Sequence, residues 1–505
     1  MSLTSAENPL YNRRMSTTTD TAQPDLDQIF SMAWSLLHHT HNDEDNTEAV
    51  EHIMRLAEWD HAAAQFELAQ LYEQGRIVPQ DVKQAAHWFQ EAAFNDHAEA
   101  AMRIGLMYLN GEGVEKNIQQ AMTWWDIAAD GGVAMAYFLQ GTAYSNGWLP
   151  EKDQQKAVAY YRKAAEAGIS IAQFYYAQSL RDGNGIEKNT KKAATWYRKA
   201  ALRGDAEAQY CLACMYLDGC GVKENHQKAI YWFKKAARQG HVLSLCILGL
   251  SYLNGVGVKQ NEQLAHLWLT EAAEKDYPEA QFRLGLLYRN SKHYRQQPGK
   301  ALYWLRRAAF QEYPDAQYLL AQCCREGFAL TQPDLRGAAY WYEKATNHRH
   351  IGAMFYLGIA CEYGFGIEIN MEKAIMLYTY AANEGHPGAQ YNLAICYHYG
   401  RGVEADMKEA LKYYRMAADG GDAAAMFNLA VCCKDGIGME KNAEESIRLY
   451  TAAAELGYVK AQVNLASSYE RGDGVPADKE KAIYWYQQAA NQGDAFAQQA
   501  LAQLA

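Results

Sequence analysis

Residues 206–240, AEAQYCLACMYLDGCGVKENHQKAIYWFKKAARQG, contain a pattern that returns, with changes, from about residue 62 to the C-terminus. Its small residue Ala208 has a counterpart in twelve units, at steps of 36 residues except for one step of 37 between Ala316 and Ala353. In a repeat of this kind each unit buries its apolar face against its neighbours only. The 505 residues are therefore read as one continuous array and need not be divided into several globular domains.

Each unit predicts two helices. Apolar positions at helical spacing predict a first helix, helix A, and a second small-residue column at Ala229, followed by Trp232 and Phe233, predicts helix B. Small residues let helices approach closely, while aromatic residues fill the space between layers. Eight of the twelve turns from A to B contain Gly-x-Gly, as at Gly219 and Gly221. We interpret these glycines as turn residues, because a phosphate-binding loop should follow a strand.

The segments outside the repeats are treated separately. Residues 1–24 are polar and lack periodicity, so we expect them to be disordered, with Met15 as an alternative start. Residues 25–61 predict a degenerate capping repeat, because an end repeat needs a polar outer face. Twelve repeats occupy residues 62–496, and residues 497–505 predict a lone C-terminal capping helix.

The motif resembles that of the Sel1-like repeats, an α/α solenoid family related to the tetratricopeptide repeats. The resemblance covers about residues 62–505 and rests on A-x-x-x-L-[GA]-x-x-Y-x-x-G-x-G-V followed by K-A-x-x-W-[YF]-x-K-A-A-x-x-G. It implies an all-α, right-handed superhelix of twelve helix-turn-helix repeats. It also implies a protein-protein interaction scaffold or adaptor, not an enzyme, with helix A lining a concave groove.

Composition favours a protein of a reducing compartment. The 48 Lys and Arg against 59 Asp and Glu give a net charge of −11, which argues against nucleic acid as a partner. No apolar run approaches the roughly 18 residues of a membrane span, and the N-terminus lacks a secretory signal. All ten cysteines fall in or next to predicted helices A, which suggests mostly buried thiols and no disulfide framework. We therefore expect a cytoplasmic protein without a membrane partner.

No set of residues predicts catalysis or a bound metal or cofactor. Cys211 and Cys214 have the spacing of a zinc knuckle or redox pair, but no second pair of ligands accompanies them. A further set of possible ligands lies in the turn of the capping repeat, where polar residues are expected in any case. It consists of His38, His39, His41, Asp43, Glu44 and Asp45.

The candidate binding surface is the non-core face of helix A. When the repeat tyrosine, such as Tyr216, is position zero, the recurrent residues gather on one side of the helix. Positions −5, −2 and +2 vary between units and gather on the other side, where they could anchor a protein or peptide; a solvated face without a ligand is the alternative. The groove residues at positions −5 and +2 are Arg103, Tyr175, Arg283, Tyr356, Tyr363, Asn392, Tyr399, Asn428, Asn464 and Arg471, and Arg289, at position +1 in a basic segment, is added to them.

One segment departs from the repeat pattern. Residues 280–311 contain no acidic residue, although the protein as a whole is acidic. The turns nearby lack Gly-x-Gly, and three helices B end at Asp276, Glu312 and Arg349 where other repeats have glycine. Such departures tend to mark functional or strained sites, so we predict an acidic partner near residues 280–350, with simple drift of the repeat as the alternative. The basic residues of the segment are Arg283, Arg289, Lys292, Arg295, Lys300, Arg306 and Arg307.

Three functions remain open. The first is a protein-interaction adaptor. The second is an inhibitor or immunity-type binder of one enzyme or toxin, which would use the same surface. The third is an enzyme, which would require a metal or a nucleophile with its partners in the groove. The sequence favours the adaptor and identifies neither its partner nor its oligomeric state.

Overall fold

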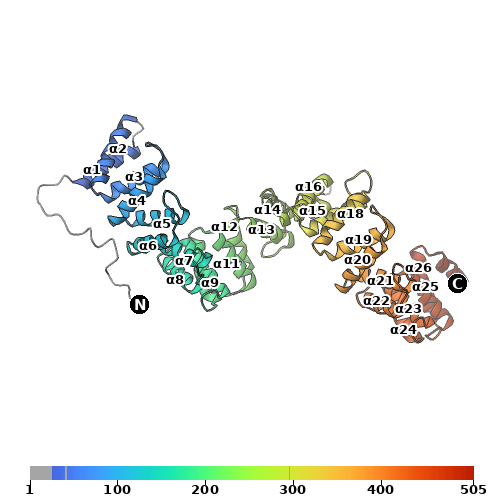
Figure 1. Ribbon diagram of the computed structural model, residues 1–505. Coiled ribbons are helices and arrows are strands. Elements are labelled where there is room, and N and C mark those ends of the chain that lie inside the picture. Colours follow the sequence, from blue (N-terminus) through green and yellow to red (C-terminus); the bar gives the residue numbers. More distant parts are fainter. Residues whose placement is uncertain (1–24, 40–42, 295, 505) are drawn as a thin grey trace. The chain divides into compact units, whose positions relative to one another are not determined.

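The computed structural model describes residues 25–39, 43–294 and 296–504, and all of their regular secondary structure is helical (Figure 1). This confirms the predicted all-α class. Residues 1–24, including Met15, lie outside the described residues. At the two ends are α1 (Leu26–His39), α2 (Asp43–Glu58) and α27 (Ala495–Leu504), the last of which begins two residues before the predicted start.

Between these ends the helices alternate, with one helix A and one helix B in each repeat. The helices A are α3 (Ala62–Gln74), α5 (Ala98–Asn110), α7 (Ala134–Asn146), α9 (Ser170–Asp182), α11 (Ala206–Asp218), α13 (Val242–Asn254), α15 (Pro278–Asn290), α17 (Pro314–Glu326), α19 (Ile351–Tyr363), α21 (Pro387–Tyr399), α23 (Ala423–Asp435) and α25 (Val459–Arg471). The helices B are α4 (Val82–Phe94), α6 (Ile118–Asp130), α8 (Gln154–Glu166), α10 (Thr190–Leu202), α12 (His226–Ala237), α14 (Glu262–Glu274), α16 (Pro298–Phe310), α18 (Leu335–Asn347), α20 (Met371–Asn383), α22 (Met407–Asp419), α24 (Ala443–Glu455) and α26 (Lys479–Asn491).

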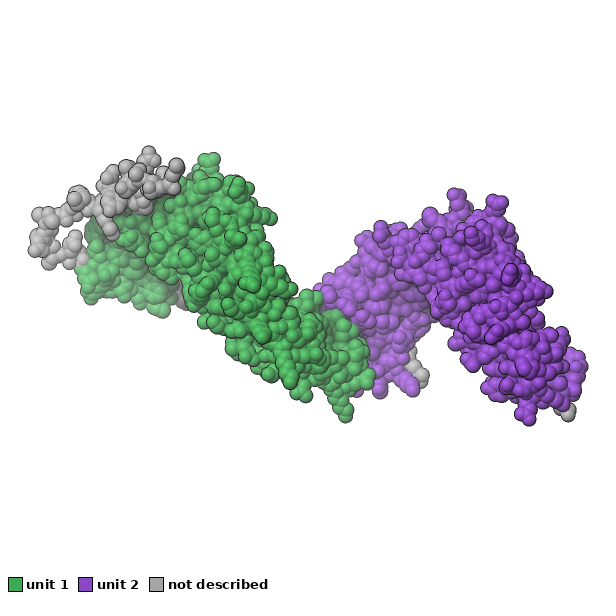
Figure 2. Space-filling model, turned by 90° about the horizontal axis from the view of Figure 1, so that it is seen from below, with its two compact units in different colours: residues 1–260 green, residues 261–505 purple. Residues whose placement is uncertain are grey.

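The helices form two compact units, which Figure 2 shows in two colours. Unit 1 comprises residues 1–260 and contains α1–α13, and unit 2 comprises residues 261–505 and contains α14–α27. Within each unit, every helix packs against the helices that precede and follow it in that unit. Each repeat therefore buries its apolar face against its neighbours, as a solenoid requires.

The core follows the two small-residue columns. In the fifth repeat Ala208 of helix A, Ala229 of helix B and the ring of Phe233 are all fully buried. The corresponding small residues of the other eleven repeats are buried as well. The packing predicted from the sequence is confirmed.

The Gly-x-Gly turn has a separate reason for each glycine. Gly219 ends α11 in the left-handed conformation, with φ 68°, which glycine adopts without a steric penalty. Gly221 has φ 73°, and a Cβ atom built on it would lie 2.3 Å from the carbonyl oxygen of Thr190 at the start of the preceding helix B. The second glycine therefore also lets one turn pack against the backbone of the neighbouring repeat.

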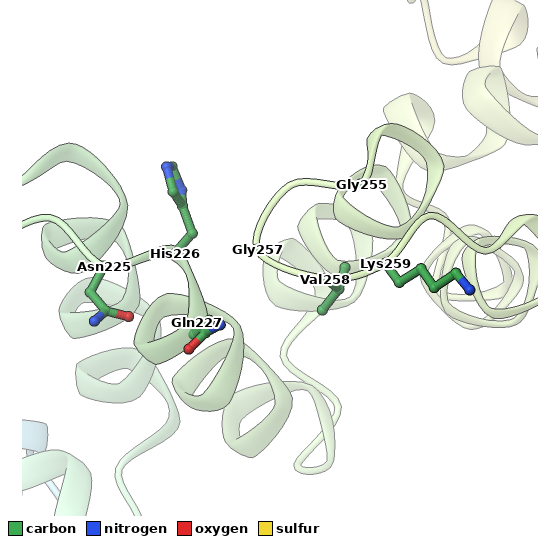
Figure 3. Close-up of a pocket in the computed structure, with 7 residues that line it drawn as sticks. All are labelled: Asn225, His226, Gln227, Gly255, Gly257, Val258 and Lys259. Carbon is green, nitrogen blue, oxygen red and sulfur yellow. The ribbon is translucent and has the colours of Figure 1, made fainter.

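Figure 3 shows the equivalent turn one repeat later. Gly255, Gly257, Val258 and Lys259 face the start of α12 across a shallow depression, which Asn225, His226 and Gln227 line from the other side. A Cβ atom on Gly257 would lie 2.9 Å from the carbonyl oxygen of His226. The depression is thus a consequence of how the repeats pack, and the structure supports our interpretation of these glycines as turn residues.

Side chains cap the first turns of the helices. Asn225, for example, accepts a hydrogen bond from the backbone N–H of Lys228 at 2.8 Å, an arrangement typical of an N-cap. Seven of the twelve helices A use aspartate or histidine in this position, as at Asp422 and His386, and in the described part of the chain the other five have no side-chain cap. Five imidazoles act in this way, each with Nδ1 as the acceptor: His61, His97, His241, His350 and His386.

A buried glutamine, which the sequence analysis did not predict, joins successive repeats. Gln209 donates from Nε2 to the carbonyl oxygen of Ala201 at 3.0 Å, and its Oε1 accepts a hydrogen bond from Gln239 at 2.9 Å. It therefore adds a side-chain donor to a carbonyl group at the end of helix B, which also accepts a hydrogen bond from the backbone N–H of Gly204 after the helix. Seven glutamines donate to helix B in this way: Gln65, Gln173, Gln209, Gln281, Gln317, Gln390 and Gln462.

The irregular segment keeps the backbone conformation of the regular repeats after its helices B. Asp276, Glu312 and Arg349 adopt φ of 60°, 61° and 60°, the left-handed region that glycine occupies after most other helices B. A side chain in this conformation costs about 1 kcal/mol or more. The turn after α15 does differ, because Ser291 is extended there and donates a hydrogen bond to Glu262 at 2.7 Å.

Candidate functional site

The groove residues lie on helices A of both units. Arg103 on α5 and Tyr175 on α9 belong to unit 1, and the other nine belong to unit 2. Most are half-buried, but Tyr363 and Tyr399, at the C-terminal ends of α19 and α21, are 50% and 66% exposed. In unit 1, Tyr175 stacks on Tyr161 with ring centroids 5.5 Å apart, and Arg103 lies 3.6 Å from Glu73.

A column of tyrosines from helices B lies beneath the groove residues of unit 2. Its members are all nearly inaccessible to solvent: Tyr342, Tyr378, Tyr414, Tyr450 and Tyr486. Four of their hydroxyl groups contact polar side chains of helix A, in the pairs Tyr378–Glu362 (2.7 Å), Tyr414–His398 (3.2 Å), Tyr450–Asn464 (3.1 Å) and Tyr486–Glu470 (2.9 Å). Because a buried hydroxyl group needs a partner, these contacts hold the surface side chains in place.

Glu362 is the most constrained of these side chains. It is 7% exposed, accepts a hydrogen bond from the Tyr378 hydroxyl group, and forms an ion pair with Arg401, which follows α21. The guanidinium carbon of Arg401 lies 5.8 Å from the ring centroid of Tyr363. Burial, together with the hydrogen bond to Glu362, raises the pKa of Tyr378, so its hydroxyl group remains a donor. A buried carboxylate with both a cation and a donor is held in one position.

Tyr356 belongs to a group of aromatic rings one repeat earlier. The Tyr356 ring stacks on the ring of Tyr342 with centroids 5.5 Å apart. The guanidinium carbon of Arg325 lies 4.4 Å from the centroid of the Tyr356 ring. The Tyr342 hydroxyl group is buried and makes no hydrogen bond within the described part of the chain. Arg325 was not among the predicted groove residues.

The remaining groove residues of unit 2 are spread along the same face. Asn428 donates to the hydroxyl group of Tyr391 at 3.3 Å, and Tyr399 stacks on His398 with centroids 4.4 Å apart. Asn392 is half-buried at the matching position of α21, and Arg471 is exposed at the end of α25. The groove residues therefore lie on successive repeats, and Asn428 and Tyr399 each contact a residue outside the predicted set.

The basic segment carries less free charge on helix A than its sequence suggests. Arg283 pairs with Glu279 at 3.2 Å, and Arg289 pairs with Glu326 at 2.8 Å. Arg307, on α16, forms an ion pair with Asp276. Arg295 lies outside the described residues. The acidic residues that flank the segment thus partly neutralise it.

The cysteines are free thiols, and seven of the ten are buried. Burial raises the pKa of Cys211 to about 11 and also raises that of Cys214, so both stay protonated near neutral pH and are poor nucleophiles and metal ligands. Nε2 of His38 lies 3.5 Å from Glu67, whereas His41 and the side chains of residues 43–45 lie outside the described residues. Within residues 25–39, 43–294 and 296–504, no group of three or more His, Cys, Asp or Glu side chains could hold a metal ion. Of the described helices, none has the length and apolar character needed to cross a membrane.

Comparison with known proteins identifies the repeat. A family model described as Sel1 repeat matches the chain at residues 62–97, 98–133, 134–169, 170–205, 206–241, 242–277, 278–311, 314–350, 351–386, 387–422, 423–458 and 459–494. A comparison with curated proteins gave no match.

Solved structures agree with the family match. The chain is 31% identical to c5321, a protective antigen present in uropathogenic Escherichia coli strains, with 90% of each chain covered and a TM-score of 0.64. It is 28% identical to a Sel1 repeat protein from Oxalobacter formigenes, over 65% of this chain and 93% of that one, with a TM-score of 0.51. The immunity protein Pa5087 from Pseudomonas aeruginosa is 20% identical with a TM-score of 0.28, which has no bearing on function.

Sel1 repeat proteins generally mediate protein-protein interactions, and their solenoid is typically a non-enzymatic scaffold. The twelve matches extend over most of the chain, from residue 62 to residue 494. This protein therefore belongs to the Sel1 repeat family.

Proposed function

We propose that this protein is an adaptor that binds a protein or peptide partner on the helix A face of unit 2, centred on α19 and α21. The observation that carries this proposal is the column of buried tyrosine hydroxyl groups that holds Glu362, His398, Asn464 and Glu470 in place. A surface whose polar side chains are already ordered loses less entropy when a partner binds.

The exposed side chains around this centre are suited to protein recognition. Tyr363 and Tyr399 present aromatic rings to solvent, and the guanidinium group of Arg401 is oriented by Glu362. Tyrosine and arginine are the residue types that most often dominate the binding energy of protein interfaces. We infer that the partner contacts these rings and the arginine together.

The test removes the two exposed rings. Full-length wild type and the variant Tyr363→Ala/Tyr399→Ala are used to capture partners from cell extract, with quantification by mass spectrometry. The matched control is Tyr484→Ala, which removes a 55% exposed tyrosine from α26 in the same unit. We expect at least one partner to be lost from the groove variant and retained by the control. With the purified partner, loss of affinity should reach about 2 kcal/mol, or roughly 30-fold. Equal capture by all three proteins would contradict the proposal.

The same captures separate an adaptor from an inhibitor. An adaptor should retain several proteins, whereas an inhibitor or immunity-type binder should retain one enzyme or toxin in stoichiometric amount. We further propose that the protein acts in the cytoplasm, on the support of its free and mostly buried thiols.

A further inference from the structure

The exposed faces of α16 and α18 carry aromatic and basic side chains that the groove does not use. We call this surface the outer patch and define it by Lys300, Tyr303, Arg306, Phe310, Tyr340 and Lys344. The rings of Tyr303, Phe310 and Tyr340 are 52%, 71% and 50% exposed. The two helices adjoin, because Phe310 packs edge-on against Trp341 of α18 with ring centroids 5.3 Å apart. The aromatic side chains therefore form one surface within unit 2.

This surface is positively charged in a protein whose net charge is −11. α16 has three basic residues and no acidic one. Its Arg307 already pairs with Asp276, and Glu343 on α18 pairs with Lys373 at 2.8 Å. Within the described residues, no carboxylate lies at ion-pair distance from any of the three cations of the outer patch. They are Lys300, Arg306 and Lys344.

We propose that the outer patch docks an acidic segment of a partner protein, one that presents carboxylates beside apolar or aromatic side chains. Cations without an internal ion pair favour a partner of opposite charge, and exposed aromatic rings next to arginine are typical of protein interfaces. Lipid-binding basic clusters usually contain four to eight cations, and the acidic net charge opposes nucleic acid, so a protein is the better match.

The outer patch lies on helices B, so this proposal does not depend on the groove. It would supply the second surface that an adaptor needs to bring two proteins together. The helices of the basic segment recognised in the sequence thus differ: the arginines on α15 are paired internally, and α16 carries the unpaired Lys300 and Arg306.

The test uses the full-length protein and a labelled random copolymer of glutamate and tyrosine, with binding followed by fluorescence anisotropy. The patch variant is Lys300→Glu/Arg306→Glu/Lys344→Glu. Its control for net charge reverses three exposed lysines of unit 1, in Lys188→Glu/Lys191→Glu/Lys192→Glu. Circular dichroism and urea unfolding test whether each variant is folded. If the triple patch variant is not folded, the single variant Arg306→Glu replaces it.

Wild type should bind the copolymer in a salt-dependent manner, and the patch variant should bind about tenfold more weakly or worse, with the control unchanged. Tyr303→Ala/Tyr340→Ala should weaken binding of the copolymer but not that of polyglutamate. The groove variant Tyr363→Ala/Tyr399→Ala should bind the copolymer normally, so failure of one proposal leaves the other standing.

Equal binding by wild type and the patch variant would overturn the inference, as would an equal loss in the charge control. Two further probes are vesicles of phosphatidylcholine with one-quarter phosphatidylglycerol, and duplex DNA. If wild type binds the vesicles or the DNA more tightly than the copolymer, and the patch variant does not bind that probe, the patch is assigned to a membrane or a nucleic acid instead. A wild-type dimer in light scattering that the patch variant lacks would assign it to a second copy of this chain.

Discussion

Lowering the pH should uncap α21 at His386. Nδ1 of this imidazole accepts a hydrogen bond from the backbone N–H of Ala389 at 3.2 Å, and the ring stacks on Phe355 with centroids 4.5 Å apart. Burial lowers the pKa of His386. Within the described residues no carboxylate lies at ion-pair distance from this imidazole, whereas His350 faces Asp315 at 3.5 Å.

The structure sets the size and the sign of the effect. A protonated imidazole cannot accept the hydrogen bond, so the helix loses a cap worth about 1 kcal/mol. A positive charge beside the first turn costs about 0.3–1 kcal/mol more. Because the pKa in the folded state lies below the usual value of about 6.5, the unfolded chain binds the proton first. The stabilisation is therefore complete above about pH 7 and is lost as the pH falls through the folded pKa.

His386→Asp tests this reasoning, because Asp422 caps α23 in the same way, accepting from the N–H of Ala425 at 2.8 Å. We expect the variant to be within about 1 kcal/mol of wild type near pH 7.5 and to lose about 1–2 kcal/mol less on acidification to about pH 5. Urea unfolding at both pH values measures the difference, and amide hydrogen exchange of residues 387–399 locates it. The same pH dependence in the two proteins would refute the argument.

The other predictions concern the joints between repeats, and urea unfolding followed by circular dichroism measures each of them. Gly221→Ala should lower the free energy of unfolding by about 2 kcal/mol or more, because the new Cβ would collide with the carbonyl group of Thr190. Gly204→Ala should lower it by only about 1 kcal/mol, because no atom lies within 4 Å of the new Cβ. Equal losses would disprove the steric reason. Glu312→Gly should stabilise the protein by about 0.5–1 kcal/mol, since it relieves a left-handed φ of 61°, and a loss of stability would show that the side chain matters more than the strain. Gln209→Ala should cost about 0.5–1.5 kcal/mol, because the Ala201 carbonyl group loses one of its donors and Gln239 loses its acceptor; no change would mean that water replaces the amide.

The repeat itself could be predicted because its signals are local and occur twelve times. The small columns at Ala208 and Ala229 indicate where helices approach, and glycine indicates where the backbone must be left-handed. The rotation of 100° per residue predicts that ten of the eleven groove residues share one face of helix A, with Arg289 to one side of it, and the binding role of that face stays a prediction.

Contacts between repeats were not predicted, because they join residues far apart in the sequence. Arg401 reaches Glu362 across 39 residues, and Arg289 reaches Glu326 across 37, so neither pair could be deduced from spacing within one helix. Four of the five helix B tyrosines of unit 2 reach a helix A side chain that varies from repeat to repeat. The sequence alone offered no signal for these partners beyond the presence of polar residues next to the repeat tyrosine.

The sequence by itself therefore determined the period, the helices, their turns and the buried columns, because these depend on backbone conformation and on residue volume. Only the tertiary structure decided which charges are neutralised between repeats and which remain free, since the ion pairs of Arg289, Arg307 and Lys373 each join side chains from different repeats. That difference separates Arg289 on helix A, which pairs with Glu326 of the next repeat, from the unpaired Arg306 on helix B.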